Sequence, residues 1–196
     1  MEQEWLDLWH RILKERQIPE REWERFSQLV KFMTMKKGEF LIREGDMPDK
    51  VAFIASGMFR AFYTTDEGDE KTIVFRGTGR PLSAYSSHLE NKEAKFSIEA
   101  LEESSLLYLS IQNFEKLLSA NPFWKEVTAL YYMNLFIEKE KRERELMSDD
   151  AETRYNNFLR EYPGLIDRIN HYHIASYLGI TNVTLSRIRR RQTTLR

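Results

Sequence analysis

The hydrophobic period changes twice along this chain, and that change limits the available folds more than any other feature. Apolar residues recur at three- and four-residue steps over residues 1–36, with Pro19 at an expected helix start. Short apolar runs follow from Gly38 to Ser110, and helical spacing returns after Ile111. We therefore expect an α+β protein in which N-terminal helices precede an antiparallel β-roll, that is, a double-stranded β-helix or jelly roll.

Glycine and turn residues divide the central region into strands. Six of the eight glycines fall between positions 38 and 79, and Asp66-Glu67-Gly68-Asp69 is a hairpin turn signal. The apolar runs between these breaks are FLI, VAFIA, MFRAFYT, KTIVF, FSIEAL and LLYLS. Their length and spacing are typical of an all-β barrel or roll.

A long helix is predicted from Asn121-Pro122 to about Met147. Its apolar stripe could pack on the chain's own barrel or on a second copy, and we favour dimerisation. The residues expected at the dimer contact are Val127, Leu130, Tyr131, Asn134 and Ile137. Ser148-Asp149-Asp150 breaks the pattern and would cap a new helix near Ala151, so a domain boundary is expected there.

Composition excludes several classes of function. The chain has no cysteine, which rules out disulfides, thiolate zinc sites and cysteine-held iron–sulfur clusters. His171 and His173 are two positions apart and would point in different directions on a helix, so no metal site is expected. No apolar run is long enough to span a membrane, and the acidic start is unlike a signal peptide, so we expect a cytoplasmic protein without a membrane partner.

Positive charge is concentrated at the C-terminal end, although the net charge of the chain is only −1. Residues 168–196 contain six arginines and no Asp or Glu. A solvated tail would explain the charge alone, but Ile174, Leu178, Leu185 and Ile188 have the spacing of a packed helix pair. We therefore expect a folded, basic C-terminal domain.

The same segment meets the steric requirements of a helix-turn-helix between about Ile169 and Arg191. Ala175 is small enough for a helix contact, and Gly179 supplies the left-handed turn four residues later. Leu185 would then seat the second helix, with the Thr181 hydroxyl as its N-cap.

The outward face of the second helix is the predicted DNA-binding surface. Arg187 and Arg190 could bind phosphate or guanine, and Val183 a thymine methyl, whereas Arg189 and Arg191 lie where the chain would meet the duplex backbone. The full set is Thr181, Asn182, Val183, Thr184, Ser186, Arg187, Arg189, Arg190 and Arg191. A helical hairpin with a merely hydrated polar face is the alternative, and the agreement of turn, cap and acid-free arginine cluster favours DNA.

An enzyme is not expected. The G-x-S-x-G, H-E-x-x-H and Walker-type phosphate-binding motifs are all absent from the sequence. The close carboxylates Glu99, Glu102 and Glu103 are interpreted as a strand end followed by a solvated turn.

Two segments resemble the Crp/Fnr transcription regulators. IASYLGITNVTLSRIRR is similar to their helix-turn-helix, and KGEFLIREGDMPDKVAFIASGMFRAF resembles the first strands of their cyclic-nucleotide-binding-type β-roll. The resemblance implies a roll sensor with N-terminal helices over 1–121, a dimerisation helix over 122–147 and a DNA-binding domain over 148–196. It also implies double-stranded DNA, a second copy of the chain and RNA polymerase as partners.

This chain departs from the pattern that the resemblance implies. Asn182 and Val183 replace the basic or proline residue and the acidic residue that commonly stand there, so a different operator is expected. Few residues follow Arg191 in this sequence, so we do not expect the β-hairpin wing that many members of the family add after the recognition helix.

The residues at the place of the cyclic-nucleotide pocket also differ from those of nucleotide-binding members. Aligned by its strands, the chain has Ser83 and Ala84 in place of the Gly-Glu pair, with Tyr85 next to them, and Ala94 and Lys95 in place of the Arg-Ser pair. The carboxylate and guanidinium are missing, and Lys95 lacks the bidentate fork. No cofactor is expected and cyclic AMP is not expected as ligand, which leaves another small effector or an effector-independent module with a degenerate roll.

Overall fold

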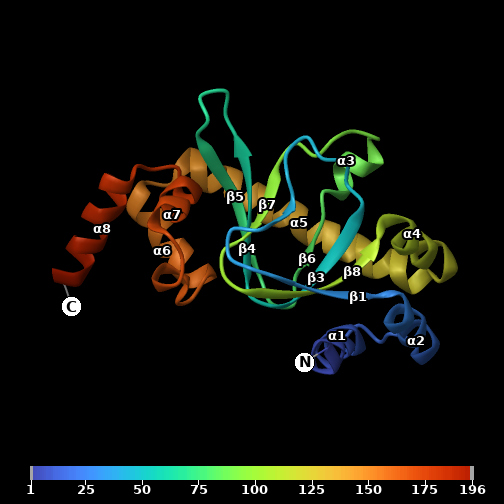
Figure 1. Ribbon diagram of the computed structural model, residues 1–196. Helices are drawn as coiled ribbons and strands as arrows, with labels where there is room; N and C mark the ends of the chain where they lie inside the picture. Colours follow the sequence, from blue (N-terminus) through green and yellow to red (C-terminus); the bar gives the residue numbers. More distant parts are fainter. Residues whose placement is uncertain (1, 195–196) are drawn as a thin grey trace. The chain divides into compact units, whose positions relative to one another are not determined.

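The computed structural model describes residues 2–194 and divides them between helices and two antiparallel sheets (Figure 1). Two helices, α1 (Glu2–Lys14) and α2 (Glu20–Leu29), begin the chain, with Pro19 at the N-cap of α2. The α+β class expected from the sequence is confirmed, because helices also follow the last strand.

Each sheet has four strands. The first has the order β1-β8-β3-β6 and the second β2-β7-β4-β5, so strands distant in sequence lie next to each other, as in a roll. The strands are β1 (Lys31–Met35), β2 (Phe40–Ile42), β3 (Lys50–Ser56), β4 (Met58–Thr64), β5 (Glu70–Gly77), β6 (Pro81–Leu82), β7 (Ser97–Ala100) and β8 (Ser104–Ser110). A short helix, α3 (Tyr85–Leu89), separates β6 from β7.

The hairpin between β4 and β5 forms at the predicted turn. Gly68 has a φ of 84°, its amide donates to the Thr65 carbonyl, and the Thr65 amide donates to the Asp69 carbonyl at 2.9 Å. Glycine adopts this positive φ at no steric cost.

The prediction that helix continues to residue 36 was wrong. Helix α2 ends at Leu29, and residues 31–35 form β1, which pairs with β8 from Lys31 opposite Tyr108 to Met35 opposite Ser104. Short apolar spacing fits either period, and here the backbone of β8 supplies the hydrogen-bond partners that decide between them.

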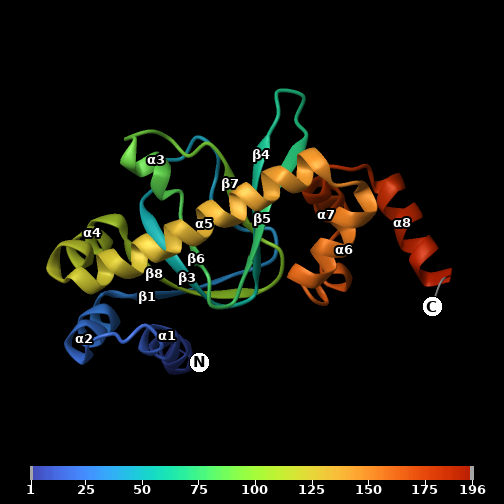
Figure 2. The same cartoon turned by 180° about the vertical axis from the view of Figure 1, so that it is seen from behind.

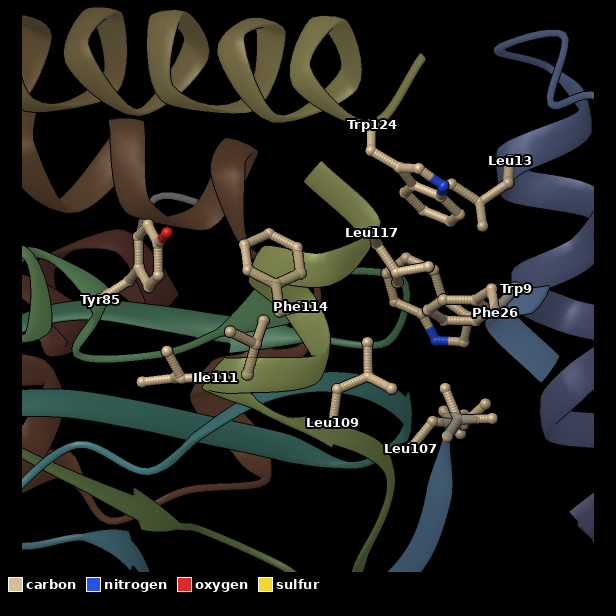
Figure 3. Close-up of a cluster of buried hydrophobic side chains, with 13 residues drawn as sticks. Trp9, Leu13, Phe26, Tyr85, Leu107, Leu109, Ile111, Phe114, Leu117 and Trp124 are labelled. Carbon is tan, nitrogen blue, oxygen red and sulfur yellow. The ribbon is translucent and has the colours of Figure 1, made fainter. Parts of the chain in front are cut away.

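Aromatic side chains from α1 and α2 pack on β8 and α4 (Ile111–Ala120) in one core (Figure 3). Trp9 and Phe26 are 4% and 0% exposed. Buried Glu22 accepts the indole N–H of Trp124 at 2.8 Å and pairs with Arg25 at 3.3 Å. The N-terminal helices are thus part of the roll's folded core.

The C-terminal half is helical. After α4 come α5 (Pro122–Ser148), α6 (Ala151–Glu161), a 3₁₀ turn (Leu165–Asp167), α7 (His171–Leu178) and α8 (Asn182–Thr194). Figure 2 shows α5 as one uninterrupted helix. The predicted start of α5 at Pro122 and the predicted cap before Ala151 are confirmed, since the Asp150 side chain accepts the Thr153 amide at 2.8 Å. Among residues 2–194, no helix combines the length and apolar character needed to cross a membrane.

The chain forms two compact units. Unit 1 contains the residues up to Tyr63 together with Phe75–Tyr131, and unit 2 contains Thr64–Val74 together with the residues from Tyr132 onward. Helix α5 and strands β4 and β5 therefore each contribute residues to both units. The functional segments predicted from the sequence, 1–121, 122–147 and 148–196, divide the chain differently and stay a prediction.

Candidate nucleic-acid interface

Helices α7 and α8 and the turn between them form a helix-turn-helix. The Asn170 side chain accepts the Tyr172 amide at 2.9 Å and so caps α7. Gly179 ends α7 with a φ of 64°, and the Ile180 amide returns to the Ala175 carbonyl at 3.0 Å. The left-handed turn predicted at Gly179 is therefore present.

Apolar side chains hold the two helices together. Ile174 and Leu178 of α7 are fully buried, and Leu185 of α8 is 1% exposed. Ala175 is 2% exposed, as a small residue at a helix contact should be, and Ile188 is also buried. The spacing that suggested a packed helix pair in the sequence thus corresponds to a real core.

The first turn of α8 is capped by Thr181. Its hydroxyl oxygen accepts the Thr184 amide at 3.2 Å, and its carbonyl accepts the Leu185 amide at 3.0 Å. Side-chain capping satisfies an amide that has no partner within the helix.

The face of α8 away from the core is polar and basic. Val183 is 67% exposed, and no acidic residue occurs in α8. The exposed members of the predicted DNA-binding set are Thr181, Asn182, Val183, Ser186, Arg187, Arg190 and Arg191. This surface presents side chains that can bond phosphate and base edges.

Two predicted DNA-binding residues are partly buried and bonded within the protein. The Thr184 hydroxyl lies 3.0 Å from the Thr181 hydroxyl. The Arg189 guanidinium lies 2.8 Å from Nε2 of His171, the first residue of α7. These two side chains are therefore less available than Arg187, and the role of His171 was not foreseen because residues eighteen apart carry no local signal.

Residues outside the helix-turn-helix fix its position within unit 2. The Arg142 guanidinium of α5 lies 4.0 Å from the ring centre of Tyr177 in α7, and Arg154 of α6 donates to the Leu178 carbonyl at 2.9 Å. Burial raises the pKa of Tyr177 and lowers the pKa of Arg142. Sequence reasoning missed both arginines, because they lie far from the motif along the chain.

Helices α5 and α6 are joined by polar contacts. Lys141 pairs with Glu161 at 3.0 Å, a hydrogen bond that raises the pKa of Lys141. The side-chain amide of Asn157 donates to buried Glu145 at 3.1 Å. The end of α5 is therefore held against α6.

Of the five residues aligned with a cyclic-nucleotide pocket, only Lys95 is charged. Ala84, Tyr85 and Ala94 are buried, and the Ser83 hydroxyl donates to the Lys50 carbonyl at 3.1 Å. Lys95 is exposed and pairs with Glu90 at 3.5 Å. The hollow that Ala94 and Lys95 line is open to solvent and is otherwise formed by Glu44, Gly45, Met47, Asn91, Lys92 and Glu93.

The roll contains an internal ion pair that sequence analysis did not predict. Arg60 of β4 and Glu99 of β7 are opposite each other in register, with 2.6 Å between guanidinium and carboxylate. The Arg60 side chain is only 2% exposed, and its guanidinium also lies 3.9 Å from the Phe62 ring centre. Glu99 lies at the strand end expected from the sequence, and its role as an ion-pair partner was not predicted.

The predicted dimer residues point in different directions from α5. Val127 packs against the unit 1 core, and the Tyr131 hydroxyl donates to the Pro81 carbonyl at 3.3 Å. Leu130, Asn134 and Ile137 are exposed. The helix also exposes large apolar side chains that were not predicted, among them Met133 at 61% and Phe136 at 68%.

Comparison with known proteins agrees with this architecture. Residues 32–121 match the family model described as the cyclic nucleotide-binding domain. A cyclic AMP receptor protein of Thermus thermophilus is 26% identical over 156 residues, which are 78% of this chain and 72% of that protein. The transcriptional activator protein Anr of Pseudomonas protegens is 25% identical over 167 residues, 79% of this chain and 67% of that protein.

The fold is shared with solved structures. The structure of FixK2 from Bradyrhizobium japonicum superposes with a TM-score of 0.73 at 20% identity, covering 85% of each chain. At this identity the likeness establishes the fold. The sequence matches add that residues 32–121 are similar to the cyclic nucleotide-binding domain and that the chain is similar to transcription regulators of the Crp/Fnr type.

Proposed function

We propose that this protein is a sequence-specific DNA-binding transcription regulator that acts as a homodimer. The observation that carries the proposal is the exposed, acid-free face of α8, with Arg187, Arg190 and Arg191 projecting from a packed and capped helix-turn-helix. Such a helix fits the DNA major groove, where arginine can read guanine or bind the flanking phosphates. The similarity to a protein named as a transcriptional activator supports the same function.

Binding to duplexes selected from a random-sequence pool tests the proposal. We expect selection to enrich a pseudo-palindrome whose half-sites are about one helical turn, roughly 34 Å, apart. The double variant Arg187→Ala/Arg190→Ala should lose this binding, whereas Arg21→Ala, which removes an exposed arginine of α2, should keep it. Failure to enrich any sequence, or equal binding by the double variant, would refute the proposal.

We propose that the second copy covers the exposed apolar face of α5. Val127 and Tyr131 are engaged with the roll, so the proposed contact consists of Leu130, Met133 and Ile137, which follow three- and four-residue spacing. Water-exposed apolar side chains on one stripe favour association. Sedimentation should give a dimer at micromolar concentration. Ile137→Glu should give a monomer, and Lys139→Glu, which alters an exposed charge elsewhere on α5, should not.

We propose that cyclic AMP is not the effector. Buried Ala84 and Ala94 offer neither the carboxylate nor the guanidinium that binds a ribose and a cyclic phosphate. A ligand that binds only the folded state at a hundred times its dissociation constant adds about 2.7 kcal/mol of stability. Cyclic AMP at millimolar concentration should therefore leave both the Tm and the DNA affinity unchanged.

The alternative function is an effector-independent DNA-binding and dimerisation module. The Arg60–Glu99 ion pair favours it, because a carboxylate of the protein itself neutralises the buried guanidinium. An unchanged DNA affinity after exhaustive dialysis and after addition of cell metabolites would support this alternative over a ligand-gated switch.

The remaining functional assignments follow from DNA binding. We propose that residues 1–121 form the roll domain, 122–147 the dimerisation helix and 148–196 the DNA-binding domain of a non-enzymatic protein that works in the cytoplasm, where the DNA is. RNA polymerase is the proposed further partner. Transcription in vitro from a template that carries the selected operator, with and without the protein, tests whether polymerase output changes.

A further inference from the structure

Strand β5 is the outer strand of its sheet, so one of its edges has no strand partner among residues 2–194. An edge of this kind presents unpaired backbone N–H and C=O groups. At residues 70–72 one side chain satisfies two of these groups. The Ser176 hydroxyl oxygen of α7 accepts the Thr72 amide at 2.8 Å, and the hydroxyl donates to the Glu70 carbonyl at 2.7 Å. We name this pair of hydrogen bonds the Ser176 bridge.

The Ser176 bridge is an unusual use of a helical serine. A serine inside a helix commonly bonds a carbonyl of its own preceding turn, as Ser119 does with Glu115 at 2.9 Å. Ser176 instead bonds a strand about a hundred residues earlier in the chain, and Thr72 is only 6% exposed. Loss of the bridge would leave the amide of buried Thr72 without this hydrogen bond, which is costly because little water reaches it.

Helix α7 links the Ser176 bridge to the DNA-binding helix. Ala175 and Leu178, on either side of Ser176, are buried in the helix-turn-helix core that seats α8. Strand β5 continues past Val74 to Gly77, from unit 2 into unit 1. A continuous series of bonded elements therefore runs from the DNA-binding face through α7 to a strand of the roll.

We propose that Ser176 is a positioning residue that couples DNA binding at α8 to the stability of the roll through β5. The inference rests on the proposed DNA-binding function. When DNA binds and orders α8 and α7, the Ser176 bridge holds residues 70–72 and so resists unfolding of the strand that continues into unit 1. By linkage, the free energy by which bound DNA stabilises β5 equals the free energy by which an ordered β5 strengthens DNA binding.

The tryptophans allow the coupling to be measured directly. All four of them, Trp5, Trp9, Trp23 and Trp124, belong to unit 1, and unit 2 has none. Tryptophan emission therefore reports the melting of unit 1 alone. The probe is a duplex of about 30 base pairs from the selection, long enough for two half-sites one turn apart. At a hundred times its dissociation constant, it should raise the wild-type Tm seen by tryptophan by about 5–10 °C.

Ser176→Ala should lose at least half of that DNA-induced shift. Ser119→Ala, which removes a helical hydroxyl of unit 1, should keep it, and Ser176→Thr, which retains a hydroxyl, should restore it. A purely structural role for Ser176 would lower the Tm with and without DNA by the same amount, leaving the shift unchanged. Since α5 also contributes to both units, a full shift in Ser176→Ala would show that α5 carries the coupling and would overturn the proposal.

Hydrogen exchange in the wild-type protein gives a second measurement that needs no variant. DNA should slow exchange of the Thr72 amide, and unchanged exchange with DNA bound would overturn the proposal. Fluorescence anisotropy of the labelled duplex, measured in the same samples, separates the two hypotheses. Absence of binding refutes DNA recognition and the coupling with it, whereas binding without a tryptophan-reported shift refutes the coupling alone.

Discussion

Replacement of Gly179 by alanine should test the geometry of the helix-turn-helix most directly. Gly179 has a φ of 64°, and a non-glycine residue in the left-handed region costs about 1–2 kcal/mol. An added Cβ would lie 3.2 Å from Cδ2 of Leu146, which is tight, but Leu146 is 47% exposed and its end can move. We therefore expect Gly179→Ala to lower the free energy of unfolding by about 1–2 kcal/mol, with little added by the contact.

Gly164→Ala is the matched control for this prediction. Gly164 also lies in unit 2, has a φ of 72°, and would place its new Cβ with nothing within 4 Å. Urea unfolding followed by far-ultraviolet circular dichroism should give similar losses for both variants. Gly179→Asn should lose less, because asparagine tolerates the left-handed conformation. A Gly179→Ala protein as stable as the wild type would refute the assigned turn, and a loss far above that of Gly164→Ala would refute the argument that Leu146 yields.

Three further predictions concern single side chains. Arg187→Ala should cost about 1–3 kcal/mol of DNA-binding free energy and relax the preference at one base pair per half-site. Arg191→Ala should lower the affinity for all DNA sequences alike and reduce the slope of log affinity against log salt concentration by about one unit. Binding titrations at several salt concentrations check both. Gly57→Ala would place a Cβ 2.0 Å from Ser104 Oγ and 2.8 Å from its Cα, so urea unfolding should show a loss of about 3 kcal/mol or more, against about 1–2 for Gly38→Ala, which has open space. Backbone hydrogen bonds hold the pKa of Asp150 below its usual value. The stability that ionised Asp150 contributes is therefore present above the unfolded-state pKa and lost as the pH falls through the folded-state pKa. Asp150→Asn, which keeps the side-chain oxygen that accepts at the cap, should reduce the dependence of the Tm on acid pH.

Most strands and helices could be predicted because their signals are local. Asn121-Pro122 and Asp150 set helix starts through the geometry of a few neighbouring residues, and the 66–69 turn is fixed by Gly68. Strand β1 could not be predicted in this way. Residues 31–35 form a strand because β8, some seventy residues later, supplies the hydrogen-bond partners, and no local pattern records that pairing.

The candidate site also contains residues that local spacing predicts and residues that it does not. The turn glycine, the Thr181 cap and the exposed Arg187 all follow from helical spacing within about twenty residues. In α5, by contrast, apolar residues occur on more than one side of the helix. Spacing alone could not separate Val127, which packs on the roll, from Ile137, which is exposed, because both belong to plausible three- and four-residue series.

The contacts around the end of α5 restrict how any signal could reach the DNA-binding helices. Lys141–Glu161, Glu145–Asn157 and the Arg142–Tyr177 contact tie the last turns of α5 to α6 and α7. Side chains therefore bridge the break at residues 149–150 between α5 and α6. If the protein dimerises through α5 as proposed, the separation of the two recognition helices depends on how the two α5 helices pack. An effector would then change DNA affinity by altering the packing of the two α5 helices, and the Ser176 bridge by altering the position of α7. Bending at the α5–α6 junction would first require the side-chain contacts between α5 and the helices α6 and α7 to break.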